Sequence, residues 1–206
     1  PYTKNELLDL LIDVKTKLIP YYVRINRLIR DIPKESIIGG NEITNLRQNI
    51  EREMKLRHLK CKCIRCREIK DKEIKLKDIK LFIEKYSASA GTEFFISYEN
   101  YDRNKLYGFL RLRFNKDKSK NIFPELKNCS IIREIHVYGK LVAHDKKASP
   151  SSAQHIGLGK KLMNEAERIS KENKYKKIAV ISGIGVREYY RKLGYKLEGE
   201  YMVKKL

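Results

Sequence analysis

The sequence predicts an α/β protein with a mixed, mainly antiparallel sheet flanked by helices. Short β-rich segments dominate residues 91–139, and helical and strand patterns then alternate to the end of the chain. The N-terminal residues differ from this pattern. Residues 1–57 carry a helix, strand, helix pattern of their own, which is too short to fold well alone. We therefore expect an N-terminal segment at 1–57, a linker at 58–80 and the main domain at 81–206.

The N-terminal segment is expected to begin with a helix that ends at Pro20. Thr3 and Glu6 have the spacing of a capping box, and apolar residues recur on one helical face at Leu7, Leu8, Leu11 and Val14. Residues 21–30 predict a strand because Val23, Ile25 and Ile29 alternate with polar residues. Residues 44–57 predict a second helix whose apolar face carries Leu46, Ile50 and Met54.

The main domain is expected to open with an antiparallel hairpin, residues 92–99 and 106–114. The next strand, 130–139, alternates between two faces, with Arg133 beside Ile131, Ile135 and Val137 and the opposite face carrying Ile132, Glu134, His136 and Tyr138. A helix follows, with an apolar stripe at Leu158, Leu162, Met163, Ala166 and Ile169. A strand at 177–182, a short helix at 186–193 and a final strand at 195–206 complete the pattern.

The charge of the chain favours a polyanionic partner. Lys and Arg number 46 against 26 Asp and Glu, a formal charge of +20. Seven of the basic residues lie between Arg52 and Arg67, with one acid among them. A solvated lysine-rich surface is the alternative, but nucleic acid explains the imbalance better. The candidate RNA-binding residues are Arg24, Arg27, Arg30, Arg47, Arg52, Lys55, Arg57, Lys60, Lys62 and Arg65.

The sequence favours a cytoplasmic location. No apolar run reaches the roughly 18 residues that span a bilayer, and no secretory signal is present. No membrane or DNA partner is expected. The chain begins at Pro1 without an initiating methionine, so we expect these residues to come from a longer protein.

Two glycines, Gly157 and Gly159, stand at the start of the predicted third helix. The first turn of a helix leaves backbone N–H groups without partners and carries partial positive charge, so it suits a phosphate group. Glycines would let a pyrophosphate approach the amides of residues 156–161, with Lys160 and Lys161 close by. The alternative is a glycine needed only for the turn into the helix.

The segment from Gln154 to Gly159 resembles the Q-x-x-G-x-G phosphate loop of the GNAT acetyltransferases. The resemblance implies the GNAT fold and a site for the pyrophosphate of acetyl-coenzyme A. The coenzyme-binding residues that it implies are Gln154, His155, Ile156, Gly157, Leu158, Gly159, Lys160, Lys161, Ile135, Val137 and Tyr190.

Longer blocks, among them "CKCIRCREI" and "AVISGIGVREYYRKLGYKLEGEYMVK", resemble the family of Elongator catalytic subunits, which are tRNA-modifying acetyltransferases. "YVRINRLIRDIP" and "NLRQ" look like the end of that family's radical S-adenosylmethionine domain. The resemblance implies acetyl-coenzyme A as substrate and the anticodon stem-loop of tRNA as partner. It also implies a carboxymethyl-type modification at the wobble uridine, and it leaves open a homodimer or Elongator-like partner subunits. The family's iron–sulfur cysteine triad does not occur here, so S-adenosylmethionine and that cluster are expected only in a domain outside this sequence.

Three of the four cysteines, Cys61, Cys63 and Cys66, form a C-x-C-x-x-C pattern. Cytosolic chains rarely use such a cluster for disulfides, and the spacing suits a zinc ion with four ligands. Cys129 would complete the set and join the linker to the sheet, and His58 is the competing fourth ligand. Three ordinary thiols are the alternative, and an iron–sulfur cluster is disfavoured because these positions match the family's linker.

Acyl transfer from a thioester needs an acid for the departing sulfur and a base for the nucleophile. By the resemblance, Tyr189 and Tyr190 flank the sulfur, and either tyrosine is a candidate acid or a core aromatic. Glu134 and His136 are candidates for orienting water or acting as base, and the sequence does not rank them.

Three functions fit this sequence. The first is an enzyme that binds and hydrolyses acetyl-coenzyme A in tRNA modification. The second is a protein-lysine acetyltransferase of the histone type, which the charge disfavours because histone tails are basic too. The third is a catalytically silent zinc-stapled RNA-binding module.

Overall fold

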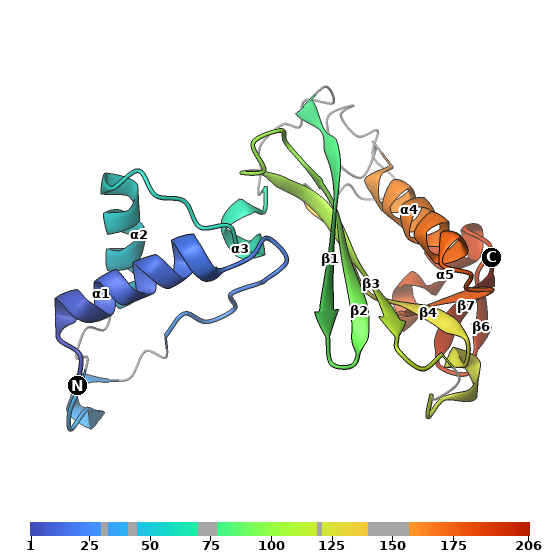
Figure 1. Cartoon of the computed structure of the whole chain (residues 1–206), viewed down its shortest axis with the longest axis horizontal. Helices are drawn as coiled ribbons and strands as arrows, with labels where there is room; N and C mark the ends of the chain where they lie inside the picture. Colours follow the sequence, from blue (N-terminus) through green and yellow to red (C-terminus); the bar gives the residue numbers. More distant parts are fainter. Residues whose placement is uncertain (30–32, 41–44, 70–77, 119–120, 140–156) are drawn as a thin grey trace. The chain divides into compact units, whose positions relative to one another are not determined.

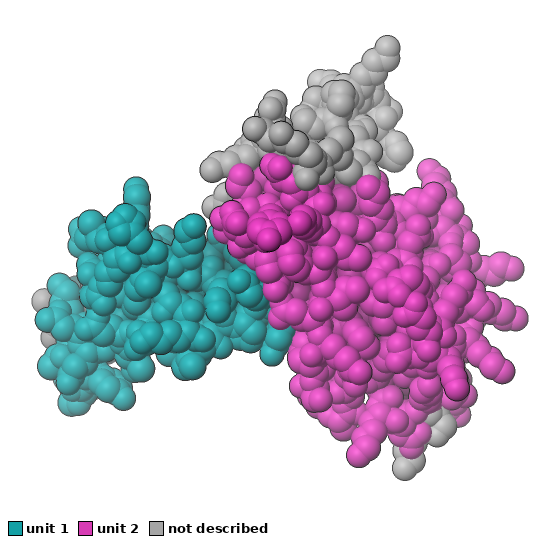
Figure 2. Space-filling model, turned by 45° about the horizontal axis from the view of Figure 1, so that its top comes forward, with its two compact units in different colours: residues 1–67 teal, residues 68–206 magenta. Residues whose placement is uncertain are grey.

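The computed structural model describes residues 1–29, 33–40, 45–69, 78–118, 121–139 and 157–206. The chain divides into two compact units, Pro1–Arg67 and Glu68–Leu206, which are teal and magenta in Figure 2. In the described part of the chain, every helix is too short or too polar to cross a membrane.

Unit 1 begins with helix α1, Lys4–Asp13, which continues into a π-helical turn, η1, Val14–Leu18 (Figure 1). The predicted capping box is present. The Glu6 amide donates to Thr3 Oγ1 at 3.3 Å, and the Thr3 amide donates to Glu6 Oε2 at 2.8 Å. These bonds satisfy two of the amides that a helix start leaves without partners, so the first helix and its starting point are confirmed.

The strand predicted over residues 21–30 is wrong. Residues 21–29 form turns and irregular backbone, and their carbonyl groups bind the cysteine segment instead. The Ile64 amide donates to the Val23 carbonyl at 2.9 Å, and Arg67 Nη2 donates to the Tyr21 carbonyl at 2.7 Å. A strand requires a neighbouring strand for its ladder, and the described residues of unit 1 offer none.

Two further helices complete unit 1 together with a 3-10 turn, η2, Lys34–Ser36. Helix α2 is Leu46–Leu56 and helix α3 is Ile64–Arg67. The predicted stripe on α2 is confirmed, because Leu46, Ile50 and Met54 are its buried residues. They pack in one small core with Ile12, Cys61 and Cys63. The cysteine segment is therefore part of the packing of unit 1.

Unit 2 is built on a seven-stranded sheet in the order β1-β2-β3-β4-β5-β7-β6. All neighbouring strands are antiparallel except β4 and β5, which are parallel, so the predicted mixed sheet is confirmed. The strands are β1 Lys80–Ala88, β2 Gly91–Glu99, β3 Leu106–Asn115, β4 Cys129–Val137, β5 Lys177–Ile181, β6 Lys196–Glu198 and β7 Tyr201–Lys205.

Two parts of this sheet were not predicted. Strand β1 is an edge strand with apolar residues on both faces, and its Leu81 and Ile83 are partly exposed, so it lacks a clean alternation. The final strand is divided into β6 and β7 by a turn at Gly199, which has a φ of 56°. A left-handed glycine permits such a reversal.

Helix α4, Leu158–Glu172, packs on one face of the sheet against β2, β3, β4 and β5 (Figure 1). Its predicted apolar stripe is confirmed, and Leu162, Met163 and Ala166 are fully buried in the main core of the unit. The short helix α5, Arg187–Lys192, follows β5 through a 3-10 turn, η5, Ile184–Val186. Another 3-10 turn, η4, Pro124–Leu126, precedes β4.

A β-bulge in β4 changes the predicted faces of that strand. Arg111 pairs with Glu134 and Leu112 pairs with Ile132, so Arg133 is an extra residue on β4. Ile132 therefore packs in the α4-side core with Ile135 and Val137, and the prediction that placed it on the opposite face is wrong. Simple alternation cannot reveal an inserted residue.

Candidate functional site

The predicted phosphate-binding turn lies at the start of α4. Gly157 is the N-cap, with a φ of 67° in the left-handed region that favours glycine. By helix geometry, the N–H groups of Leu158, Gly159 and Lys160 have no carbonyl partner within the helix. The Lys161 amide already donates to the Gly157 carbonyl at 3.0 Å, so it does not contribute to this set. Gln154, His155 and Ile156 lie outside the described residues.

Gly157 and Gly159 are glycines for different structural reasons. A Cβ atom on Gly157 would contact nothing within 4 Å, so its need for glycine comes from its backbone conformation. A Cβ atom on Gly159 would lie 2.9 Å from the hydroxyl of Tyr189 and 3.8 Å from Val137 Cγ2. Gly159 thus allows the tyrosine hydroxyl to lie against the first turn of α4. Leu158, between the two glycines, is fully buried and anchors this turn.

The two adjacent tyrosines of α5 have different environments. Tyr189 is 39 % exposed, whereas Tyr190 is 5 % exposed and belongs to the main core. The Tyr190 ring meets those of Tyr189 and Tyr195 edge-on, at centroid distances of 5.2 and 6.0 Å. Burial raises the pKa of Tyr189, and burial together with the neighbouring Tyr189 raises that of Tyr190. Both hydroxyls therefore keep their protons at neutral pH, and Tyr189 is the more accessible of the two.

Glu134 and His136 lie on the face of the sheet opposite α4. Glu134 accepts a hydrogen bond from Arg111 Nε at 2.9 Å. The exposed His136 lies beside the aromatic rings of Phe109 and Tyr138, at centroid distances of 6.2 and 4.7 Å. Because Ile135 and Val137 point to the α4 side, the structure does not bring Glu134 and His136 onto the face that carries Gly159 and Tyr189.

Strands β4 and β5 pair over only part of their length. The parallel pairing ends at Ile132 and Val180, β5 stops at Ile181, and β4 continues to Val137. A hollow of about 300 Å³ lies at this point, lined by Arg113, Asn115, Leu126, Ile131, Arg133, Ile181 and Tyr201.

Two arginines at this hollow were missed by the sequence analysis. Arg113 Nη1 and Arg133 Nη1 donate to Glu93 Oε1 at 3.0 and 2.6 Å, and Glu93 is 1 % exposed. Paired charges stabilise a buried carboxylate that would otherwise be costly to desolvate. Cross-strand pairing of these residues depends on the register of β2, β3 and β4, so no local pattern identifies it.

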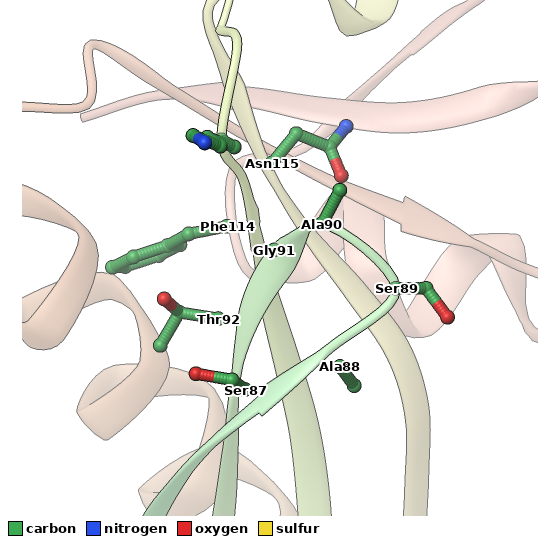
Figure 3. A pocket seen from close by; sticks show the side chains of 9 residues that line it. Ser87, Ala88, Ser89, Ala90, Gly91, Thr92, Phe114 and Asn115 are labelled. Carbon is green, nitrogen blue, oxygen red and sulfur yellow. The ribbon is translucent and has the colours of Figure 1, made fainter.

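A second hollow, of about 440 Å³, lies at the turn between β1 and β2 (Figure 3). Ser89 and Ala90 have φ values of 44° and 56°, which indicate a type I′ turn. Arg113 holds this turn by donating to the Ala88 and Ser89 carbonyls at 3.1 and 2.7 Å. The described lining residues include no carboxylate, imidazole or thiol, and Lys116 is their one basic side chain.

Unit 1 brings the sulfur atoms of Cys61, Cys63 and Cys66 within 4.8 Å of one another, a group that can hold a metal ion. Cys61 and Cys63 are buried and Cys66 is exposed. The Cys63 amide donates to Cys61 Sγ at 3.5 Å. Hydrogen bonds from the side chains of Cys61 and Cys66 lower the pKa of Cys63, because two thiols stabilise one thiolate.

Cys129, one of the two predicted fourth ligands, lies in unit 2. Its side chain is 2 % exposed and packs in unit 2 with Leu126, Ala179 and Val203. Burial raises the pKa of Cys129 to about 12, as expected for an apolar site. His58, the competing candidate, is exposed and lies outside the group of three. Within unit 1, the described residues thus bring three possible ligands together.

The predicted RNA-binding residues differ in how far their charges are balanced. Arg47 donates to Glu51 at 3.0 Å, and Arg57 donates to Glu53 and Asp9 at 2.8 Å each. Arg65 donates to the Asn26 carbonyl at 3.3 Å. Arg24 is half-buried, and Arg30 lies outside the described residues. The remaining candidates are exposed, namely Arg27, Arg52, Lys55, Lys60 and Lys62.

Two family models match the chain in succession. Residues 1–56 match the Radical_SAM C-terminal domain, and residues 56–195 match the Acetyltransferase (GNAT) family. The first match explains the small helical segment that precedes the cysteines. The second covers most of unit 2, including the start of α4 and both tyrosines.

Individual relatives extend over the whole chain. It is 43 % identical to Elongator complex protein 3 of Danio rerio and 44 % identical to the tRNA uridine(34) acetyltransferase of Methanocaldococcus infernus, covering 100 % of this chain in each case. The solved structure of archaeal M. infernus Elp3 with an N-terminal deletion is 41 % identical, with a TM-score of 0.81, and covers 100 % of this chain and 49 % of that one. The chain spans 38 and 39 % of the length of the two curated relatives.

Proposed function

The chain belongs to the GNAT acetyltransferase family, and from this premise we propose that unit 2 binds acetyl-coenzyme A and cleaves its thioester for the modification of tRNA. The observation that carries the proposal is the first turn of α4, where Gly157 and Gly159 expose backbone amides beside the Tyr189 hydroxyl. Such a turn suits a pyrophosphate group. The exposed Lys160 and Lys161 add positive charge at the same place.

The rest of the coenzyme site is proposed on either side of this turn. Val137 lies 3.8 Å from the position that a Cβ atom on Gly159 would take, and Ile135 shares its face of β4. The proposed polar contacts from the preceding segment are Gln154, His155 and Ile156. Tyr190 supports the site from the core rather than through its hydroxyl.

The proposed reaction uses Tyr189 as the acid. An oxygen nucleophile adds to the acetyl carbonyl carbon, the carbon–sulfur bond breaks, and the Tyr189 hydroxyl gives its proton to the departing thiolate. Glu134 or His136 receives the proton of the nucleophile. Both lie on the opposite face of the sheet, so they would act where β4 and β5 no longer pair, beyond Ile132 and Val180.

The proposed acceptor is tRNA, as the name of the archaeal relative indicates for that protein. The exposed basic residues of unit 1 would contact the phosphates of the anticodon stem-loop, and the wobble uridine would receive the acetyl unit as a carboxymethyl-type group. S-adenosylmethionine and an iron–sulfur cluster would supply the radical chemistry from a domain outside these residues. The proposed location is cytoplasmic.

The cysteine group is proposed to bind zinc. Three thiolates within 4.8 Å of one another form a donor set that suits this ion. Zinc would fix the turn between Cys61 and Cys66 and so stabilise unit 1. The fourth ligand would be a water molecule or a group outside the described residues.

Thiol release from acetyl-coenzyme A, with and without tRNA, tests the reaction. We expect Tyr189→Phe to lower the rate by roughly 10²-fold or more, because general acid catalysis contributes on this scale, while coenzyme affinity is retained. Tyr190→Phe serves as the matched control and should change the rate far less. Equal rates in the wild type and Tyr189→Phe would remove Tyr189 from the mechanism. A wild-type rate equal to that of buffer would mean that the chain does not cleave the thioester.

The pH dependence gives a second test of Tyr189. Burial raises the pKa of Tyr189, so the neutral, proton-donating form persists to higher pH than in a free tyrosine. The contribution of Tyr189, measured as the rate ratio of wild type to Tyr189→Phe, should stay constant from pH 7 to about 10. A ratio that falls with an apparent pKa near neutrality would assign the acid role to another group.

Binding of tRNA is tested by a salt series. Neutralising exposed residues such as Lys55 or Lys60 should weaken binding and lower the slope of log affinity against log salt by about one for each phosphate that the variant no longer neutralises. Arg57→Gln is the control, because Arg57 already pairs with Glu53 and Asp9. Unchanged slopes in the lysine variants would place the tRNA on another surface.

A further inference from the structure

A buried lysine lies beside the cysteine group. The Lys15 side chain is 5 % exposed, and its Nζ atom lies 3.9 Å from Cys66 Sγ. Figure 1 shows the end of α1 close to α3, which carries Cys66. A small cavity of about 10 Å³ lies at the same point, lined by Lys15, Ile25, Leu28, Arg47, Cys63, Arg65 and Cys66. Lys15 is thus a buried residue that lies next to the proposed metal ligands.

The local structure of the helix directs Lys15 inward. Lys15 follows Leu11 by four residues and Ile12 by three, which places it on the apolar face of α1. It also lies in the π-helical turn η1, where the Ile19 amide donates to the Val14 carbonyl at 3.2 Å. Single π turns are uncommon and occur frequently at functional sites. The neighbouring Lys17 faces solvent and pairs with Asp13 at 2.8 Å.

The position of Lys15 requires a compensating negative charge. Removing an ammonium group from water is costly unless an opposite charge or hydrogen-bond acceptors replace the solvent. Among the described residues, the hydrogen-bond acceptor found for Lys15 is the sulfur of Cys66. Three thiolates around a divalent cation carry one negative charge in excess, which is the charge that one lysine neutralises.

We propose that Lys15 is a positioning residue for the metal site, whose ammonium group offsets the excess negative charge of three cysteine thiolates on a divalent, thiophilic cation and so raises the affinity for that cation. This inference rests on the proposed zinc site. It explains why a lysine occupies a core position of α1 beside the three-cysteine group of unit 1.

The test measures zinc affinity of the whole chain by competition with a chromophoric chelator. Lys15→Leu should bind zinc roughly 10 to 100 times more weakly, the scale found for groups that support metal ligands. Lys15→Arg, which keeps the charge, should restore most of the affinity. Lys17→Leu, the exposed control, should match the wild type. Lys15→Leu with wild-type affinity, or Lys15→Arg as weak as Lys15→Leu, would overturn the proposal.

Cobalt binding separates charge from packing. At saturation, Lys15→Leu should keep the sulfur-to-cobalt charge-transfer absorption of the wild type, because all three thiolates still bind the ion. A changed spectrum at saturation would overturn the proposal, since Lys15 would then shape the ligand set through packing. A wild-type chain that binds neither zinc nor cobalt would instead refute the metal site itself.

Discussion

The two units of this chain are stabilised in different ways. Unit 2 has a continuous sheet and a core of sixteen buried residues, whereas the core cluster of unit 1 has six, two of which are cysteines. Short segments bury too little apolar surface to fold well without help from a metal or a partner. The comparison indicates that the proposed metal site matters most for folding in unit 1, and that unit 2 folds on its apolar core.

Metal removal should give the largest difference in stability between unit 1 and unit 2. Structural zinc sites contribute on the order of 10 kcal/mol of binding free energy that is coupled to folding. A chelator should therefore abolish hydrogen-exchange protection in α1 and α2 and leave β2, β3 and α4 protected. Cys63→Ser should act like the chelator, and Cys129→Ser should leave zinc binding unchanged. Equal protection of unit 1 with and without metal would show that its apolar core suffices.

A core substitution in unit 2 should have the next largest effect. Leu162 of α4 is fully buried in the main core, so Leu162→Ala should lower the free energy of unfolding of unit 2 by about 2 to 5 kcal/mol. Zinc affinity should not change. Leu197→Ala, at a site that is 42 % exposed, is the control. Loss of zinc binding in Leu162→Ala would mean that the two units fold together.

The contact between Gly159 and Tyr189 should give the smallest effect, about 1 to 2 kcal/mol. Gly159→Ala places a methyl group 2.9 Å from the Tyr189 hydroxyl but 3.8 Å from the ring carbon that carries it. The substitution should destabilise the wild type and cost much less in a Tyr189→Phe background. Denaturant unfolding of the four proteins completes this cycle. Additive effects would show that the hydroxyl does not lie against the helix.

The sequence predicted correctly those helices whose apolar pattern lies within the helix itself. The stripe from Leu158 to Ile169 identified α4 because helical periodicity is carried by the residues themselves. Residues 21–29 also alternate, yet they form no strand, since their carbonyl groups bind Ile64 and Arg67. The phosphate-loop resemblance located the start of α4, where Gly157 has a left-handed backbone and Gly159 lies against the Tyr189 hydroxyl.

Contacts between distant residues could not be predicted in this way. Cys129 was selected because it is the one remaining cysteine in the sequence, and its burial in the core of unit 2 could not be derived from that count. The proximity of Lys15 and Cys66 joins residues 51 positions apart. In the sequence, the signal for this contact is the position of Lys15 on the apolar face of the first helix. The difference between Tyr189 and Tyr190 depends on the orientation of α5, which sequence spacing does not fix.

The bulge at Arg133 has a consequence for the whole sheet. Bulges bend the strand that carries them, and this one follows directly after Ile132, the last residue of β4 that pairs with β5. A chain that lacked this one residue would keep Glu134 and Ile135 on their present sides, but a straighter β4 could continue to hydrogen-bond along its parallel neighbour. The two strands would then stay paired past Ile132 and Val180, and Glu93 would lose one of the two arginines that pair with it.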